Sequence, residues 1–153
     1  MGKAVEHLIA ASCILASGLE LNVSTSFVDD EGVDLVFHRR ESSTTLAVQV
    51  KSRSLEANTV AAERFIAHVG ASTFRPRPDL HILFVVVHAA QGTFGPCWLV
   101  PSLTLAERKQ PNPKNRRVFS ASLKPNTKDW WADFRHERPE LPGRILAALD
   151  ALG

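Results

Sequence analysis

The 153-residue sequence has two cysteines and no apolar run long enough to span a bilayer. Cys13 and Cys97 lie far apart, and neither has the close cysteine or histidine partner that a zinc site needs, so the sequence predicts neither a disulfide nor bound zinc. We interpret both cysteines as small buried apolar residues. The formal net charge is only +2, and together with plentiful leucine, isoleucine, valine and phenylalanine this argues against intrinsic disorder.

The sequence also lacks the features of a signal peptide. Glu6 stands where the apolar run of such a peptide begins, and we therefore expect a cytoplasmic protein. With 44% hydrophobic and 22% charged residues, the chain has enough apolar side chains for one core. The composition predicts a single domain over residues 1–153.

The first half of the chain reads as one helix followed by three strands. Apolar residues at three- and four-residue spacing predict a helix over 3–17, which ends at Gly18. Alternating apolar residues over 21–27 and 33–37, and an apolar run over 46–50, predict a meander with an acidic turn at 29–32. A second helix is predicted over 56–69.

The second half begins with a strand of nearly continuous apolar residues over 80–87, which is typical of a strand buried on both faces. Further strands are predicted at 97–100 and 118–123. Helices are predicted at 103–108, 130–134 and 141–152. The tryptophans and the phenylalanine at 130–134 have helical spacing. We therefore interpret them as core residues, in preference to residues that stack on nucleic-acid bases.

Three polar side chains are expected to meet on one face of the predicted sheet. Val33, Leu35 and Phe37 form an apolar stripe, so Asp34 points to the opposite face of its strand. In the next strand Gln49 and Lys51 likewise oppose the apolar stripe and lie roughly 7 Å apart. Burying a carboxylate, an amide and an ammonium together is costly unless they pair or bind a ligand. The alternative is a solvated sheet face.

These residues resemble the PD-(D/E)XK nuclease superfamily, which has the restriction-endonuclease-like fold, and in particular its branch with Gln-x-Lys. The matching residues are Glu6, Gly32-Val33-Asp34 and Gln49-Val50-Lys51-Ser52, with Val33 in the place of the family's proline. Small intron-encoded homing endonucleases look similar. The resemblance implies an α/β fold with an α-β-β-β-α-β core, in which helices flank a mixed central sheet.

The resemblance also implies a role for each site residue. Asp34, the side chain of Gln49, the backbone carbonyl of Val50 and Glu6 would hold Mg²⁺ or Mn²⁺. Lys51 would position the attacking water and counter the charge on the scissile phosphate. Gln49 replaces an acidic residue and so weakens the metal site. Glu6 also has a structural interpretation, because a glutamate in a first helical turn interacts favourably with the helix dipole.

A basic stretch without acidic residues runs from Arg108 to Lys128, and it predicts contacts with a phosphate backbone. A solvated loop and hairpin is the structural alternative. The candidate nucleic-acid-binding residues are Arg53, Arg108, Lys109, Lys114, Arg116 and Arg117.

The sequence therefore predicts a metal-dependent endonuclease that hydrolyses DNA phosphodiester bonds. A homodimer or larger assembly is expected if both strands of a duplex are cut. Two alternatives stay open: a non-catalytic nucleic-acid-binding or assembly subunit with the same fold, and a small protein-interaction or immunity-type module.

Overall fold

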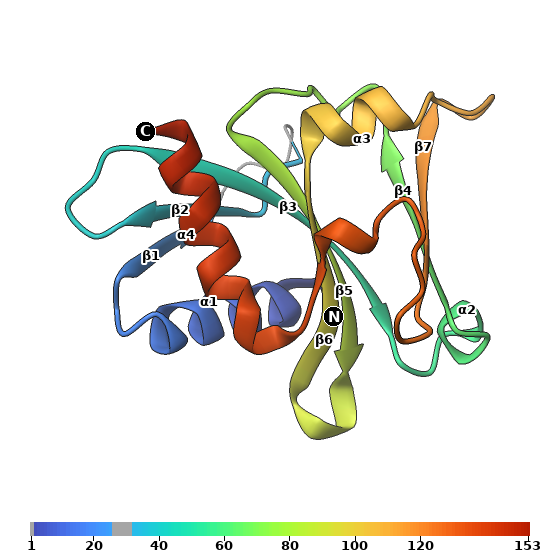
Figure 1. The fold of residues 1–153 in the computed structure, drawn as a ribbon, viewed down its shortest axis with the longest axis horizontal. Helices are drawn as coiled ribbons and strands as arrows, with labels where there is room; N and C mark the ends of the chain where they lie inside the picture. The colour runs from blue at the N-terminus through green and yellow to red at the C-terminus, as the bar shows by residue number, and fades with distance from the viewer. Residues whose placement is uncertain (1, 26–31) are drawn as a thin grey trace.

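A computed structural model describes residues 2–25 and 32–153 (Figure 1). The α-helices are α1 (Gly2–Ala16), α2 (Asn58–Ala61), α3 (Ser102–Arg108) and α4 (Leu141–Leu152). The strands are β1 (Leu21–Thr25), β2 (Leu35–Arg39), β3 (Thr45–Ser54), β4 (Arg64–Gly70), β5 (Leu80–His88), β6 (Thr93–Pro101), β7 (Arg116–Ser122) and β8 (Arg135–His136). Apart from Gly32, the predicted acidic turn lies outside the described residues.

The central sheet is mixed and has the strand order β1-β2-β3-β5-β6-β8. Strands β3 and β5 are parallel, whereas the other neighbours in this sheet are antiparallel. The two remaining strands, β4 and β7, form a separate antiparallel ribbon. A mixed central sheet flanked by helices is the predicted fold class, and it is confirmed.

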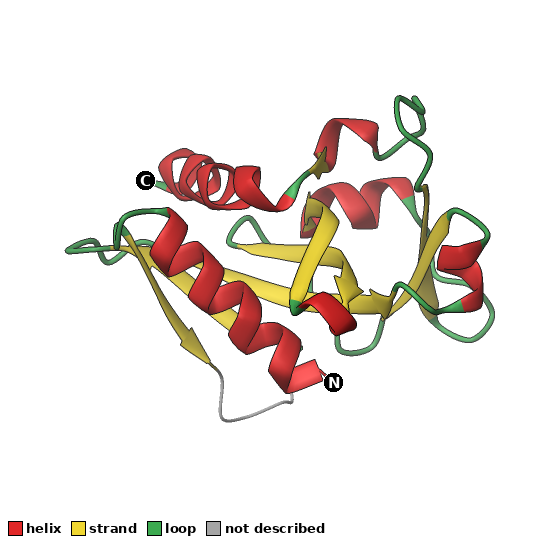
Figure 2. Cartoon of the chain, turned by 90° about the horizontal axis from the view of Figure 1, so that it is seen from below, coloured by secondary structure: helices red, strands yellow, loops and turns green. Residues whose placement is uncertain are grey.

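Each face of the central sheet is covered by different elements. Helices α1 and α4 pack their apolar residues against one face, where Val48, Leu83 and Val85 are buried. The β4–β7 ribbon and α3 cover the other face, which includes Ile82 and Phe84. Figure 1 and Figure 2 show α1 and α4 toward one end of the molecule and the ribbon toward the other. Strand β3, with ten residues, extends from the helical half to the ribbon.

The helix predicted over 56–69 is wrong. Only the four-residue helix α2 forms, and 64–70 is strand β4. Phe65, Ala67 and Val69 are fully buried, while the residues between them are partly exposed. This alternation is that of a strand with one buried face, and it is fixed by pairing with β7, about fifty residues further along the chain.

The helix predicted over 130–134 is also wrong. Asp129 accepts hydrogen bonds from the backbone N–H groups of Ser122 (2.8 Å) and Trp131 (2.9 Å), which organises a turn instead. A short 3₁₀ turn and strand β8 follow. Trp131 is buried in the core as predicted, but Trp130 is 65% exposed.

The other predicted helices and strands are present, but β3 ends four residues later than predicted and β6 begins four residues earlier. Residues 26–27 of the strand predicted over 21–27 lie outside the described residues. Cys13 and Cys97 are free and fully buried, as the sequence predicts, and burial raises the pKa of the Cys13 thiol to about 12. None of the helices in the described part of the chain combines the length and the apolarity that a membrane span requires.

Candidate functional site

The three polar residues lie where β2 and β3 separate. The ladder between these strands runs from the pair His38 and Thr45 to the pair Leu35 and Val48. One residue further, the Asp34 N–H donates to the Val48 carbonyl over 2.9 Å. Two residues further along β3, the Val50 N–H donates to Asp34 Oδ2 over 2.7 Å. The carboxylate thus takes the place of a strand carbonyl at the end of the ladder.

This hydrogen bond fixes the position of the Asp34 carboxylate relative to the Gln49-Val50-Lys51 segment. A side-chain carboxylate that accepts a backbone N–H is held in one orientation. Asp34 is half-buried. The sequence therefore places an oriented anion beside the two other polar residues.

The side chain of Gln49 lies against Gly32. A Cβ built on Gly32 would be 3.0 Å from Gln49 Nε2 and 3.4 Å from its Cδ, and Gly32 has a φ of +70°. Any other residue at position 32 would be strained and would crowd the amide. Gly32 therefore belongs to the candidate site through its contact with Gln49. The sequence did not predict this contact, although the glycine two residues before Asp34 is visible in it.

Strand alternation places Gln49 and Lys51 on the same face of β3. Their β5 partners are Ile82 and Phe84, which belong to the core under the ribbon, while Val48 and Val50 pack toward α1. The predicted apolar stripe is wrong at Val33, because Leu35 and Phe37 pack toward α1 whereas Val33 belongs to the core under the ribbon. Asp34 directly precedes β2, and its carboxylate lies at the backbone of β3, where it accepts the Val50 N–H. Asp34 accordingly lies beside the Gln49–Lys51 segment at the end of the β2–β3 ladder, and its sharing of a face with both residues stays a prediction.

Glu6 is buried on the sheet-facing side of α1, with 7% of its surface exposed. Its Oε2 atom lies 3.2 Å from the Nζ of Lys3, whose side chain is 70% exposed. The first turns of α1 line a pocket with Val87 and His88, so Glu6 lies toward the end of the sheet where β3 finishes. Helix α1 covers the face opposite to Gln49 and Lys51, and the sharing of a ligand with Asp34 stays a prediction.

The oxygen ligands at this site suit a hard divalent cation, but together they carry little negative charge. In the described ranges no three histidine, cysteine, aspartate or glutamate side chains gather as a metal cluster. The available oxygens are the Asp34 carboxylate, the Gln49 amide and backbone carbonyls of β3, which are the ligand types of Mg²⁺ and Mn²⁺. The Gln49 amide lies against Gly32, and Lys51 adds a positive charge to the same segment of β3.

The predicted basic residues divide into two groups. Arg108 stacks over Trp131 and Phe134 and donates to the Trp130 carbonyl, while Arg117 stacks over Phe74 and donates to the carbonyl of Lys109. These two arginines hold α3 and its flanking segments together, which is a structural role that the sequence did not predict.

The second group of basic residues lies on the β4–β7 ribbon and on the segments next to it. Arg53 follows Lys51 on the same face of β3 and donates to the Ile66 carbonyl of β4 over 3.0 Å. Arg116 begins β7, and Lys114 is exposed in the turn before it. Lys109 is separate from these, with its Nζ 5.1 Å from the centre of the Trp130 ring.

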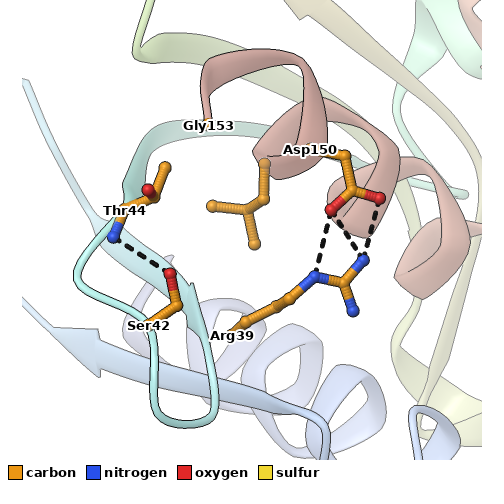
Figure 3. Close-up of a pocket in the computed structure, with 6 residues that line it drawn as sticks. Arg39, Ser42, Thr44, Asp150 and Gly153 are labelled. Atoms are coloured by element: carbon orange, nitrogen blue, oxygen red, sulfur yellow. Dashed lines mark hydrogen bonds and ion pairs between the residues drawn. The ribbon is translucent and has the colours of Figure 1, made fainter.

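A pocket at the opposite end of β2 from Asp34 has a different character (Figure 3). Arg39 forms hydrogen bonds with both carboxylate oxygens of Asp150, at 2.8 and 2.9 Å, and pairs with Glu20. Ser42, Thr44, Leu149 and Gly153 complete the lining. Because the arginine is already paired with two carboxylates, this pocket joins the C-terminal helix to the sheet and is a poor anion site.

Comparisons with known proteins agree with this fold. No family model and no curated protein matches the sequence. Among solved structures, the bacterial homing endonuclease I-Ssp6803I matches with a TM-score of 0.54 and 15% sequence identity, covering 94% of this chain and 91% of that chain. The chain therefore has a nuclease-like fold over nearly its whole length.

Proposed function

We propose that this protein is a metal-dependent endonuclease that hydrolyses DNA phosphodiester bonds. The observation that carries the proposal is the hydrogen bond from the Val50 N–H to Asp34, which holds a carboxylate beside Gln49 and Lys51 at the end of the β2–β3 ladder. The likeness of the whole fold to that of a homing endonuclease supports the same function.

Each residue has a distinct role in this proposal. Asp34, the Gln49 amide oxygen and the Val50 carbonyl would hold Mg²⁺ or Mn²⁺, with Glu6 as a further carboxylate. When bound, such an ion supplies Lewis-acid stabilisation of charge on the phosphate. Lys51 orients the attacking water and counters the negative charge that develops on the phosphate oxygens. The ammonium of Lys51 would thus stabilise the pentacoordinate transition state from the protein side.

The alternative function is a non-catalytic nucleic-acid-binding or assembly subunit with the same fold. The observation that favours it is the charge of the cluster, because Gln49 is neutral and Lys51 offsets Asp34. A site with few charged oxygens binds divalent cations weakly.

The proposal is tested by incubating the protein with plasmid, single-stranded and branched DNA in the presence of Mg²⁺ or Mn²⁺. We expect metal-dependent nicking that stops when EDTA is added. DNA retardation without cleavage under any metal would support the binding subunit, and absence of both would exclude a DNA function. Cleavage of both strands would point to a dimer or larger assembly, since each chain offers one site.

A further inference from the structure

The outer face of the β4–β7 ribbon gathers basic side chains beside the candidate site. In β4 the buried residues alternate with Ile66 and His68, which point away from the core. His68 pairs with Val118 of β7, and Arg116 is two residues before Val118. His68 and Arg116 are therefore diagonal neighbours on this face, within reach of each other's side chains.

Arg53 and Lys114 complete the group from two other elements. The Nε of Arg53 donates to the Ile66 carbonyl (3.0 Å) and its Nη1 to the Ser52 carbonyl (2.8 Å), which holds the guanidinium at the edge of β4. Lys114 lies in a turn fixed by Asn112, whose Oδ1 accepts the backbone N–H groups of Lys114 and Arg116, both at 3.0 Å. All four side chains are thus brought together by backbone structure.

The group has donors that no acceptor in the described part of the chain satisfies. His68 Nδ1 and Arg116 Nε are buried atoms without a hydrogen-bond partner there. Leaving a buried polar group unpaired is costly. An anion with several oxygens would accept from the Arg116 guanidinium and from the protonated form of His68.

The charges around His68 are of one sign. Its pKa is lowered by burial and by the positive charges of Arg116 of β7, Arg53 of β3 and Lys114 of the turn, and no acidic side chain in the described ranges contributes to this shift. The acidic residue at the start of β4, Glu63, pairs with Lys124 at the other end of the ribbon. A bound anion would therefore meet an uncompensated positive surface.

We propose that Arg53, His68 and Arg116, with Lys114 at the rim, form a binding site for the DNA phosphate next to the scissile one. The proposal rests on the nuclease function proposed above, and it adds His68 to the DNA-binding residues. Arg53 and Lys51 are two residues apart on the same face of β3, roughly 7 Å, so the two phosphates would belong to the same strand. The ribbon would then guide the backbone toward Lys51.

The test measures the affinity for a labelled DNA duplex in EDTA, which prevents cleavage, at about pH 5.5 and about pH 7.5, on either side of the ordinary histidine pKa. A phosphate that binds His68 favours its protonated form, so the parent should bind more tightly at the lower pH, by up to about tenfold if the pKa rises by one unit. The His68→Gln variant should lose most of this difference. Arg116→Ala should weaken binding at both values and lower the salt slope by about one.

Arg40→Ala is the matched control, because Arg40 is an exposed arginine at the far end of β2 and its loss removes the same charge. A pH dependence that persists in His68→Gln, or an equal loss of affinity in Arg116→Ala and Arg40→Ala, would overturn the phosphate site.

NMR titration of the His68 imidazole with and without the duplex separates this proposal from the nuclease function. A raised pKa in a protein that does not cleave DNA would support the phosphate site and contradict the nuclease function. Cleavage with an unchanged His68 pKa would support the nuclease function and contradict the phosphate site. Absence of DNA binding would overturn both proposals.

Discussion

The N–H of Val50 and the Oδ2 of Asp34 form a 2.7 Å hydrogen bond across the point where β2 and β3 separate. The Asp34 side chain takes the place of a backbone carbonyl that would have continued the β2–β3 ladder. This satisfies a donor of β3 and aims an anion at the segment that carries Gln49 and Lys51. Local strand structure and the candidate chemistry therefore depend on the same carboxylate.

Replacing Gln49 with Glu should tighten metal binding, because affinity for hard cations rises with the number of charged oxygen ligands. We expect the parent to bind Mn²⁺ weakly, on the order of millimolar, and the Gln49→Glu variant to bind it at least tenfold more tightly. Calorimetric titration with Mn²⁺ measures both. Equal affinities would show that the Gln49 side chain does not face the ion.

Replacing Lys51 with Ala should separate metal binding from cleavage. Removal of a neighbouring positive charge should leave Mn²⁺ affinity unchanged or raise it, whereas plasmid nicking should fall by about a hundredfold or more, since the charge that opposes the phosphate is lost. The two measurements are made on the same preparation. Retention of full nicking activity by Lys51→Ala would remove Lys51 from the mechanism.

Gly32→Ala should damage the site more than its backbone strain alone explains. Gly18 is the matched control, because its φ of +64° resembles the +70° of Gly32 while a Cβ there would meet no atom within 4 Å. Both alanine variants should lose about 1 kcal/mol of unfolding free energy. Only Gly32→Ala should also weaken Mn²⁺ binding, because the new methyl group displaces Gln49. Equal Mn²⁺ affinity in the two variants would contradict the contact.

The free energy of unfolding should fall below neutral pH because of the buried His136 and the half-buried His81. Burial lowers the pKa of His81 and of His136 from the ordinary 6.5. Below about pH 6.5 the unfolded chain binds these protons and the folded protein does not, so stability is present above that pH and is lost as the pH falls, by up to about 1.4 kcal/mol per histidine per pH unit.

Urea unfolding at a series of pH values checks this expectation. The His136→Gln variant should show a shallower dependence than the parent, because His136 is 3% exposed. His7→Gln, at an exposed position of α1, is the control and should retain the parent's dependence. An unchanged pH dependence in His136→Gln would refute the assignment to His136.

The sequence predicted the first strands of the sheet because they depend on local alternation. Side-chain direction within β3 follows from neighbouring residues, so the common face of Gln49 and Lys51 could be predicted. The same alternation was wrong just before β2, because Val33 packs under the ribbon and not with Leu35 and Phe37. Strand β4 could not be predicted in this way, because its partner β7 lies far along the chain and the spacing of Val60, Phe65 and Val69 also fits a helix. Long-range pairing decided between the two.

The roles of the basic residues could also not be predicted from the local sequence pattern. Arg108 and Arg117 occur in a basic stretch, yet both are engaged with aromatic rings and backbone carbonyls of α3 and its surroundings. His68 gave no signal in the sequence, because it joins Arg53 and Arg116 only once β3, β4 and β7 come together.

The central claim is that the Asp34 carboxylate supports metal-dependent cleavage, and Asp34→Asn tests it most directly. The amide oxygen of asparagine still accepts the Val50 N–H, so the unfolding free energy should change by no more than about 1 kcal/mol, while the charge that attracts the cation is removed. We predict that Mn²⁺-dependent nicking of supercoiled plasmid by the parent disappears in this variant. Undiminished nicking by folded Asp34→Asn protein would contradict the account.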